Sequence, residues 1–287
     1  MKEIVVLSGK GGTGKTSIVS SFAAIARDAV LVDCDVDAAD LHILLQPTVN
    51  QKHEFWSGQY AYIDQNRCTK CGLCEELCRF NAIKDYKVDL VSCEGCGFCS
   101  HICPAEAISM KENMSGYWYV SDTVYGPFIH ARLGIAQENS GKLVAKVRQQ
   151  AMQIAETQHK QYIISDGPPG IGCPVISSLS GVNMALLVTE PTLSGIHDLE
   201  RVLGVCVHFG VQTAVCINKW NINDDNTRQI EAYCDTQGVD VVAKIPFDNV
   251  FTEAIVRGIP VVNYTDSAVG QQLRSLWQSI AEKSINN

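Results

Sequence analysis

The sequence predicts an α/β fold in which a mostly parallel sheet is flanked by helices and interrupted by a small α+β insert. Three observations predict this fold. Short apolar runs alternate with stretches of helical periodicity, a Gly-rich loop joins the first run to the first helix, and a cysteine-rich stretch breaks the alternation. Such alternation is typical of sheets that helices cover on both faces.

Six apolar runs are the expected strands of the sheet. They lack a polar face, which is typical of parallel strands that are buried on both sides. The runs cover residues 3–7, 29–33, 162–166, 184–189, 213–218 and 241–246. Helical stretches are expected at 17–28, 142–157, 195–208, 225–237, 248–257 and 267–284. In the last of these, Leu273, Leu276, Trp277 and Ile280 share one face, so we expect it to cover the sheet.

The cysteine-rich stretch contains an internal repeat of 25 residues. Cys68, Cys71, Cys74 and Cys78 recur as Cys93, Cys96, Cys99 and Cys103, and Gly72 recurs as Gly97. Two small repeated units inside an α/β domain are the simplest explanation. We therefore predict a sheet domain formed by residues 1–57 and 116–287, with an inserted domain at 58–115.

Charge and hydropathy exclude several classes of protein. The 287 residues include 23 Lys and Arg against 31 Asp and Glu, a formal charge of −8. This acidic balance argues against nucleic acid as a partner and against a membrane surface. No run of 18 apolar residues is present, and no cleavage site follows the N-terminal apolar run. We therefore expect a protein of the cytoplasm.

The Gly-rich loop matches G-x-x-x-x-G-K-[ST], the P-loop pattern. It consists of Gly9, Lys10, Gly11, Gly12, Thr13, Gly14, Lys15 and Thr16. Glycines let successive backbone N–H groups turn toward phosphate oxygens, and the following helix adds its positive end. Lys15 is expected to reach the β- and γ-phosphates, and the Thr16 hydroxyl to bind Mg²⁺. The loop predicts a P-loop NTPase that binds ATP or ADP.

The cysteine count excludes a disulfide framework for a chain in a reducing compartment. Thirteen cysteines are present, and eight of them form two C-x2-C-x2-C-x3-C runs. This run is typical of bacterial ferredoxins, in which the fourth cysteine ligates the other cluster. We expect one [4Fe–4S] cluster on Cys68, Cys71, Cys74 and Cys103, and another on Cys93, Cys96, Cys99 and Cys78. The runs therefore predict that the insert is a ferredoxin-like α+β domain. Zinc is the competing interpretation, because CxxC pairs also form Cys₄ zinc sites.

The loop as a whole resembles the deviant Walker A motif of the MinD/ParA/Mrp ATPases and the nitrogenase iron protein group. The resemblance rests on KGGTGKT with its early Lys10, and on the segments Asp33–Asp37, Glu138–Val144 and Asp166–Pro174. It implies that Lys10 reaches the nucleotide of a partner subunit, so that ATP joins two subunits. A solvated lysine in the loop is the alternative for Lys10.

The same resemblance implies roles for residues that follow the expected strands. Asp35 would orient the attacking water, Asp33 would lie near the Mg²⁺ shell, and Asp166 would be the Walker B aspartate before a switch loop at 167–170. Asn218 and Pro246 would contact the adenine. For Asp37 and Asp40, capping of the next helix is as good an explanation as contact with Mg²⁺. Lys10, Lys15 and Asp35 are the catalytic candidates, with slow ATP hydrolysis as the implied activity.

Three functions remain open from the sequence. The first is ATP-gated electron transfer through two [4Fe–4S] clusters to a redox partner. The second is an Fe–S cluster carrier or assembly factor like Mrp, with an Fe–S acceptor as its partner. The third is a spatial organiser like MinD with redox-sensing clusters. A nucleotide-dependent homodimer, or a heterodimer with a paralogue, is expected in each case. Cys173 is expected to be a small buried residue or, as the resemblance to the nitrogenase iron protein implies for a cysteine seven residues after Asp166, a cluster ligand.

Overall fold

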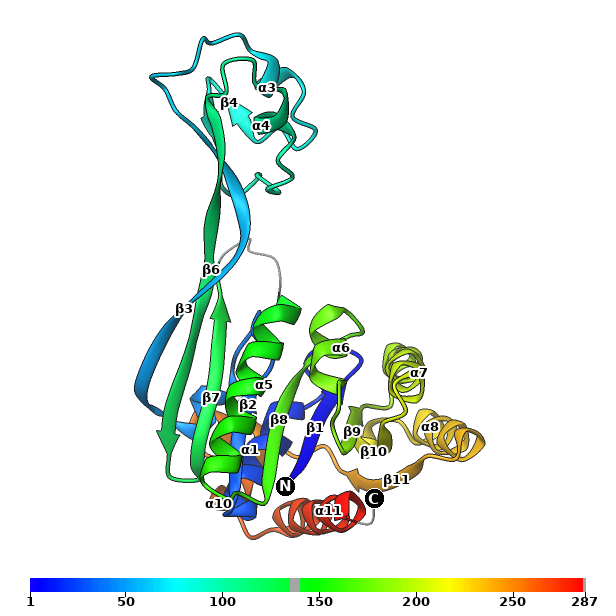
Figure 1. Ribbon diagram of the computed structural model, residues 1–287. Coiled ribbons are helices and arrows are strands. Elements are labelled where there is room, and N and C mark those ends of the chain that lie inside the picture. Colours follow the sequence, from blue (N-terminus) through cyan, green and yellow to red (C-terminus); the bar gives the residue numbers. More distant parts are fainter. Residues whose placement is uncertain (135–139, 286–287) are drawn as a thin grey trace. The chain divides into compact units, whose positions relative to one another are not determined.

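The structure, a computed structural model, describes residues 1–134 and 140–285 (Figure 1). Glu138 and Asn139, which belong to one of the segments that carry the resemblance, therefore lie outside the described residues. The strands are β1 (Lys2–Ser8), β2 (Ala29–Asp33), β3 (Thr48–Ile63), β4 (Ile83–Lys84), β5 (Lys87–Val88), β6 (Ile108–Thr123), β7 (Gly126–Leu133), β8 (Tyr162–Pro169), β9 (Met184–Thr189), β10 (Gln212–Asn218) and β11 (Asp240–Ile245). The helices are α1 (Lys15–Ala26), α2 (Leu41–Leu45), α3 (Leu73–Glu76), α4 (Phe98–Ile102), α5 (Ser140–Thr157), α6 (Cys173–Leu179), α7 (Leu193–His208), α8 (Asp224–Gln237), α9 (Val250–Val256), α10 (Val261–Tyr264) and α11 (Ala268–Ile285).

The large sheet has the order β11-β10-β9-β1-β8-β2-β7-β6-β3. All pairs from β11 to β7 are parallel. The six strands expected from the sequence are six consecutive strands in this order, β11, β10, β9, β1, β8 and β2, so the prediction of a mostly parallel sheet is confirmed. Because the strands are parallel, their carboxyl ends meet at one edge, where ligands bind in open α/β sheets.

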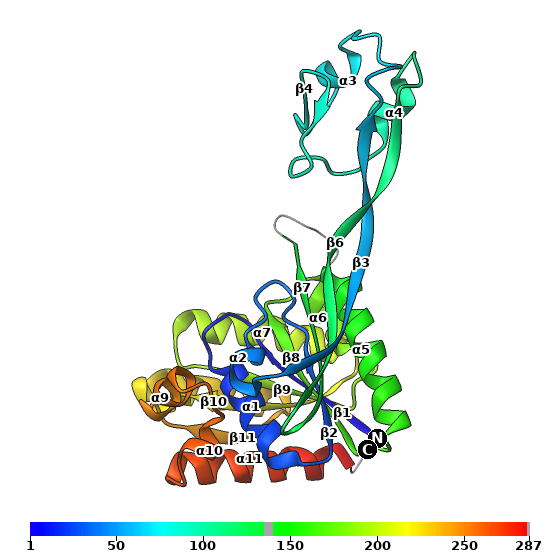
Figure 2. The ribbon, with the colours of Figure 1, turned by 90° about the vertical axis from the view of Figure 1, so that its left-hand side faces the viewer.

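The core lies in two layers, one on each face of the sheet. Alternate residues of β1 divide between them: Ile4 and Val6 pack with α1, α10 and α11, whereas Val5 and Leu7 pack with α6, α7 and α8. Because both faces are covered, the strands need no polar face, which explains their continuous apolar sequence. The helices α10 and α11, which contact one another, lie side by side in Figure 2.

The last helix covers the sheet as the sequence predicts. Leu273, Leu276, Trp277 and Ile280 of α11 are buried, and the Trp277 ring lies 5.2 Å from that of Phe22 in α1. No helix in the described ranges is long and apolar enough to cross a bilayer.

Several elements are absent from the sequence prediction. The strands β3 and β6 have 16 residues each, and β7 joins the sheet beside β2. Most side chains of β3 are exposed, so it has no apolar periodicity that could reveal it. The boundaries expected at 58 and 115 fall inside β3 and β6, respectively. The short helices α2, α6 and α10 were also not predicted, because four to seven residues carry too little periodicity.

The chain divides into two compact units. The first contains Met1–Lys52, Trp118–Arg132 and the chain from Ser140 onward. The second contains His53–Tyr117 and a short segment that begins at Leu133.

The second unit shows the 25-residue repeat in its structure. The helices α3 and α4 each follow a glycine in the left-handed region, Gly72 with φ 83° and Gly97 with φ 75°. The equivalent residues Ile83 and Ile108 are both buried in one small core that includes Cys74, and five further cysteines pack against it. The repeated sequence therefore forms two equivalent loop-and-helix units around a shared core.

One ring in the first unit gives a testable pH dependence. His130 of β7 stacks on Phe128 and Tyr119, and Ser121 Oγ lies 3.0 Å from its Nε2. Burial, and then the neighbouring His42, lower the pKa of His130 from 6.5 to about 4. The unfolded chain therefore binds a proton between pH 6.5 and 4 that the folded chain does not, and stability is lost as the pH falls through this range. The shift is worth about 3 kcal/mol.

We expect the wild type to lose about 3 kcal/mol more unfolding free energy than His130→Phe between pH 7 and pH 4. Urea unfolding at both pH values measures the difference. An equal loss in the two proteins would contradict the assignment to His130.

Candidate functional site

The first candidate site lies at the carboxyl edge of the parallel sheet. The P-loop follows β1 directly and leads into α1, which begins at Lys15. Asp33 ends β2 and pairs in register with Asp166 of β8. The sheet therefore brings together the P-loop and two of the acidic residues that the sequence singled out, although about 130 residues separate the two aspartates along the chain.

The conformation of the P-loop depends on Gly14. Its φ is 91°, and a Cβ at this position would meet the Asn218 Nδ2 atom at 2.4 Å. Asn218, buried at the end of β10, donates from Nδ2 to the carbonyl oxygen of Thr13 over 2.7 Å. Gly14 is required both for the left-handed backbone and for this close approach.

Lys15 lies in the centre of a group of carboxylates. Its Nζ is 2.6 Å from Asp166 Oδ1, and both side chains are buried. Burial lowers the pKa of Lys15, but Asp166, and then Asp35 and Asp33, outweigh burial and raise it. The ammonium thus contacts Asp166 and also feels the charges of Asp35 and Asp33.

The positive charge of Lys15 does not fully offset the burial of Asp33 and Asp35. Burial, and then the charge of Asp166, raise the pKa of Asp33 well above its usual range, although Lys15 opposes the shift. Burial raises the pKa of Asp35 to about 6, with Asp166 contributing and Lys15 opposing. Carboxylate oxygens are the type of ligand that Mg²⁺ takes, and Asp33 and Asp166 stand opposite one another in register on neighbouring strands.

An unpaired polar atom points to the phosphate site. Thr13 Oγ1 is buried and has no hydrogen-bond partner among the residues that the structure describes. A buried hydroxyl without a partner costs free energy, which a bound oxygen ligand would offset. Thr16 lies in the first turn of α1 and is half-buried. The residues present therefore fit a nucleotide with Mg²⁺.

Local bonds fix the aspartates after β2. Asp33 accepts hydrogen bonds from the backbone N–H of Asp35 at 3.0 Å and of Leu41 at 3.2 Å. Asp40 is the N-cap residue of α2, but its side chain makes no capping bond. Asp33 thus supplies the bond to the start of α2 that the sequence assigned to Asp37 or Asp40, both of which are exposed.

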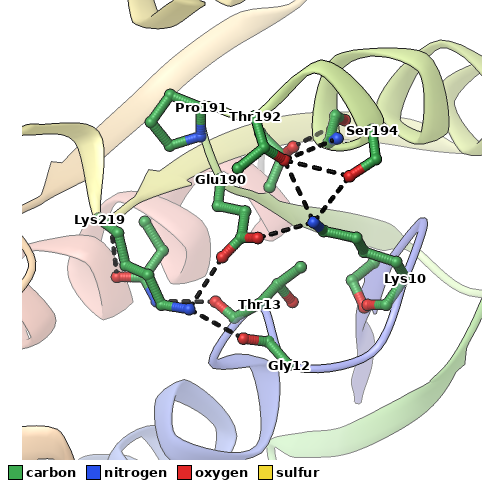
Figure 3. Close-up of polar contacts among 12 residues, drawn as sticks. Lys10, Gly12, Thr13, Glu190, Pro191, Thr192, Ser194 and Lys219 are labelled. Atoms are coloured by element: carbon green, nitrogen blue, oxygen red, sulfur yellow. Dashed lines mark hydrogen bonds and ion pairs between the residues drawn. The ribbon is translucent and has the colours of Figure 1, made fainter. Parts of the chain in front are cut away.

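Lys10 is held by its own chain. Its Nζ contacts Glu190 Oε1 at 2.7 Å, and it donates to Ser194 Oγ at 2.9 Å and Thr192 Oγ1 at 3.1 Å (Figure 3). It is therefore not the free, solvated lysine that the sequence left as an alternative. Its role across a dimer interface is taken up below as a proposal.

Sequence reasoning missed Glu190 and the role of Lys219. Glu190 follows β9 directly, and its Oε2 is 2.8 Å from Lys219 Nζ. Lys219 also donates to the carbonyl oxygen of Gly12 in the P-loop over 3.0 Å. Their positions just after the expected strands 184–189 and 213–218 were the available signal, because the ends of parallel strands meet at one edge.

The switch loop expected at 167–170 is largely strand. β8 continues through Pro169, and Pro169 pairs in register with Ser8. A Cβ on Gly167 would meet Leu7 Cδ2 at 2.4 Å, so the glycine allows this close pairing. Gly170 then leaves the strand with φ 89°.

The adenine candidates lie at the ends of β10 and β11. Asn218 contacts the P-loop backbone as described above, whereas Pro246 directly follows β11 and is half-buried. The neighbouring Phe247 has 55% of its surface exposed, and its N–H donates to Asn221 Oδ1 at 2.7 Å. An exposed aromatic ring at this edge is available for stacking on a base.

The second candidate site is formed by the cysteines of the second unit. A cavity of about 380 Å³ is lined by Cys78, Cys93, Cys96 and Cys99, and also by Cys74, which lines both cavities. A smaller cavity is lined by Cys68, Cys71, Cys74 and Cys103. The fourth cysteine of each run thus lies with the first three of the other run, which is the crossed arrangement that the spacing predicts for ferredoxin clusters.

The cysteines within each run lie close enough to influence one another. Burial, and then Cys68 and Cys71, raise the pKa of Cys74, and burial with Cys93 raises that of Cys99. The backbone N–H of Ala107 donates to Cys103 Sγ at 3.3 Å, a bond that tunes cluster potential in iron–sulfur proteins.

Within residues 1–134 and 140–285, no three His, Cys, Asp or Glu side chains converge as ligands of a single ion. In a cubane cluster each cysteine binds a different iron atom, so its four ligands surround the cluster and need not converge on one point. Two [4Fe–4S] clusters on these cysteine sets are taken up below as a proposal.

The five remaining cysteines divide differently from the prediction. Cys34, Cys206, Cys216 and Cys234 are buried, as expected. Cys173 is exposed at the start of α6, so its interpretation as a small buried residue is wrong. The reason is local: α6 begins at Cys173, with Pro174 in its first turn, and its buried side chains begin at Val175.

Comparison with known proteins agrees with the geometry of the first site. Residues 4–261 match the family described as the CobQ/CobB/MinD/ParA nucleotide binding domain. An uncharacterized protein of Methanocaldococcus jannaschii is 31% identical over 283 residues, covering 98% of this chain and 96% of that protein. The septum site-determining protein MinD of Pyrococcus horikoshii, solved with Mg-ADP, has a TM-score of 0.61 at 20% identity and covers 97% of this chain and 95% of its own. An iron–sulfur cluster carrier protein of Pyrococcus abyssi is 26% identical over 160 residues, about half of each chain.

Proposed function

Because the chain belongs to the CobQ/CobB/MinD/ParA family of nucleotide-binding domains, we propose that it is an ATP-dependent switch with two [4Fe–4S] clusters in its cysteine-rich unit. We further propose that it hydrolyses ATP slowly and forms a homodimer or a heterodimer with a paralogue. Its proposed location is the cytoplasm.

The P-loop and its acidic neighbours support the part of the proposal that concerns ATP. In the proposal, the backbone of residues 9–16 and Lys15 hold the phosphates, while Thr16, Asp33 and Asp166 hold Mg²⁺. Asp35 orients the attacking water, and Asn218 and Pro246 lie on the side of the base. Positioning and charge neutralisation are the main tasks of a protein in phosphoryl transfer, and these side chains are of the required types.

The two cysteine-lined cavities support the part of the proposal that concerns the two iron–sulfur clusters. Eight cysteines divide between them in the crossed pattern, which neither a buried core nor two independent CxxC zinc sites requires. Bound [4Fe–4S] clusters would supply one-electron transfer. In this proposal, ATP controls when a redox partner receives electrons from the second unit.

An Fe–S cluster carrier is the second candidate. Its support is the exposure of Cys173 seven residues after Asp166, together with the half-length similarity to a cluster carrier protein. Passage of labelled iron intact to an apo-acceptor would favour the carrier. A change in cluster midpoint potentials when ATP replaces ADP would favour electron transfer, and ATP-dependent binding to lipid vesicles would favour a spatial organiser.

ATP with Mg²⁺ is expected to convert the anaerobically purified protein from monomer to dimer, and Lys10→Ala is expected to stay monomeric. The reason is that the ammonium of Lys10 lies at the exposed side of the P-loop and carries the charge that would hold a partner's phosphate. Light scattering coupled to gel filtration measures the mass. A Lys10→Ala variant that dimerises as the wild type does would contradict this mechanism.

A further inference from the structure

Glu190 joins two lysines from different parts of the P-loop site. Its Oε1 contacts Lys10 Nζ at 2.7 Å, and its Oε2 contacts Lys219 Nζ at 2.8 Å. Figure 3 shows the carboxylate between the two ammonium groups, with Gly12 and Thr13 of the P-loop beside them. Only 13% of the Glu190 side chain is exposed, whereas 28% of Lys10 and 29% of Lys219 are, so the two ion pairs are partly shielded from water.

The neighbours of Glu190 complete the partners of Lys10. An ammonium has three N–H donors, and Lys10 has three oxygens within reach: Glu190 Oε1, Thr192 Oγ1 and Ser194 Oγ. All three lie within five residues, from Glu190 just after β9 to Ser194 in the first turn of α7. Lys10 is thus fully coordinated by its own chain.

The charge of Glu190 is well defined. Burial raises its pKa, but the hydrogen bonds from Lys10 and Lys219 outweigh burial and hold the pKa of Glu190 below its usual range. The carboxylate is therefore ionised at neutral pH. Its two partners differ, because Lys219 also donates to the carbonyl oxygen of Gly12, whereas the other partners of Lys10 are two hydroxyls.

We propose that Glu190 is a positioning residue that retains Lys10 on its own subunit and sets the ATP concentration at which two copies join. The proposal rests on the ATP-dependent dimerisation proposed above. For Lys10 to contact phosphate in a second copy, it must give up its charge-assisted bond to Glu190. Lys219 stays with Glu190 when Lys10 leaves, so the carboxylate is not left buried without a counter-charge.

The first test measures the retention of Lys10 without nucleotide. Reductive methylation of the full-length protein is followed by mass spectrometry of the peptide that contains Lys10. We expect Glu190→Gln to speed methylation of Lys10 about tenfold, which is on the order of one charge-assisted hydrogen bond. Glu231→Gln removes the same charge from a surface pair with Lys244 and is expected to change nothing. Equal rates in Glu190→Gln and the wild type would overturn the proposal.

Ser194→Ala gives an independent check if Glu190→Gln fails to fold. It removes one neutral hydrogen bond to Lys10 and leaves Glu190 in place. A smaller acceleration of Lys10 methylation, about twofold, is expected because a neutral bond contributes less than a charged one. A Lys10 that reacts no faster in Ser194→Ala than in the wild type would count against retention by this segment.

The second test measures dimerisation. The ATP concentration for half-maximal dimerisation is expected to fall about tenfold in Glu190→Gln. In a Lys10→Ala background, the Glu190→Gln change is expected to have no effect, because Glu190 acts through Lys10. A higher ATP requirement in Glu190→Gln would overturn the proposal. If the wild type fails to dimerise with ATP, the proposed function fails, whereas the methylation test still decides the role of Glu190.

Discussion

Replacing Cys78 and Cys93 together by serine is expected to leave about four iron atoms per chain, whereas replacing Cys93 and Cys103 together is expected to leave almost none. Cys78 and Cys93 line the same cavity, so their loss removes one cluster and spares the other. Cys103 lines the second cavity, so the other pair damages both clusters. Both variants lose two cysteines, and they differ in whether the lost cysteines line the same cavity or different cavities.

The iron content decides between crossed and uncrossed ligation. The wild type is expected to hold about eight iron atoms per chain after anaerobic purification. Colorimetric iron and sulfide analysis gives the content, and electron paramagnetic resonance of the reduced protein identifies the clusters. Cys216→Ser, which changes a buried cysteine of the first unit, is the matched control and is expected to keep about eight irons. Uncrossed ligation would reverse the results of the two double variants, and zinc in place of iron would contradict the cluster assignment.

Replacing Arg148 by methionine is expected to destabilise the first unit by about 3–5 kcal/mol. Arg148 of α5 forms a bidentate pair with Glu3 of β1, with Nε 2.7 Å from Oε1 and Nη2 2.8 Å from Oε2. Glu3 is 4% exposed and Arg148 is 5% exposed. Arg148 also donates to the carbonyl oxygen of Ser177 in α6, so its side chain joins a strand and two helices. Removal of Arg148 leaves the Glu3 carboxylate buried and unpaired, which is the main source of the loss.

The double variant separates the unpaired charge from the loss of packing. Glu3→Leu combined with Arg148→Met removes both charges, and most of the stability lost in Arg148→Met is expected to return. Urea unfolding followed by circular dichroism, at equal iron content, measures the wild type, both single variants and the double variant. A double variant as unstable as the sum of its single changes would show that the pair acts through packing and not through charge compensation.

Local sequence patterns predicted most of the elements. The strands around β1 are recognisable because burial on both faces requires continuous apolar residues, and the P-loop because its backbone requires glycine, as at Gly14. The cysteine runs are equally local, since one loop and one helix turn hold all four positions. Long strands such as β3 could not be predicted, because most of their side chains are exposed and impose no apolar period.

The partners of the functional side chains required the tertiary structure. Lys10 and Thr192 are 182 positions apart, and no local pattern connects the P-loop to the turn after β9. The sequence likewise gave no reason to single out Glu190, which is one acidic residue after one strand. Only the order of the parallel strands brings β9 beside β1 and places Glu190 next to Lys10.

The sequence by itself therefore determined the parallel α/β sheet, the P-loop and the spacing of the eight cysteines. Each of these is encoded within a few consecutive residues by backbone geometry or by burial. The tertiary structure decided which carboxylate holds Lys10, which carboxylate holds Lys15, and which cysteines face a common cavity. These pairings depend on side chains far apart in the chain, which only the packing of strands and helices brings within reach of one another.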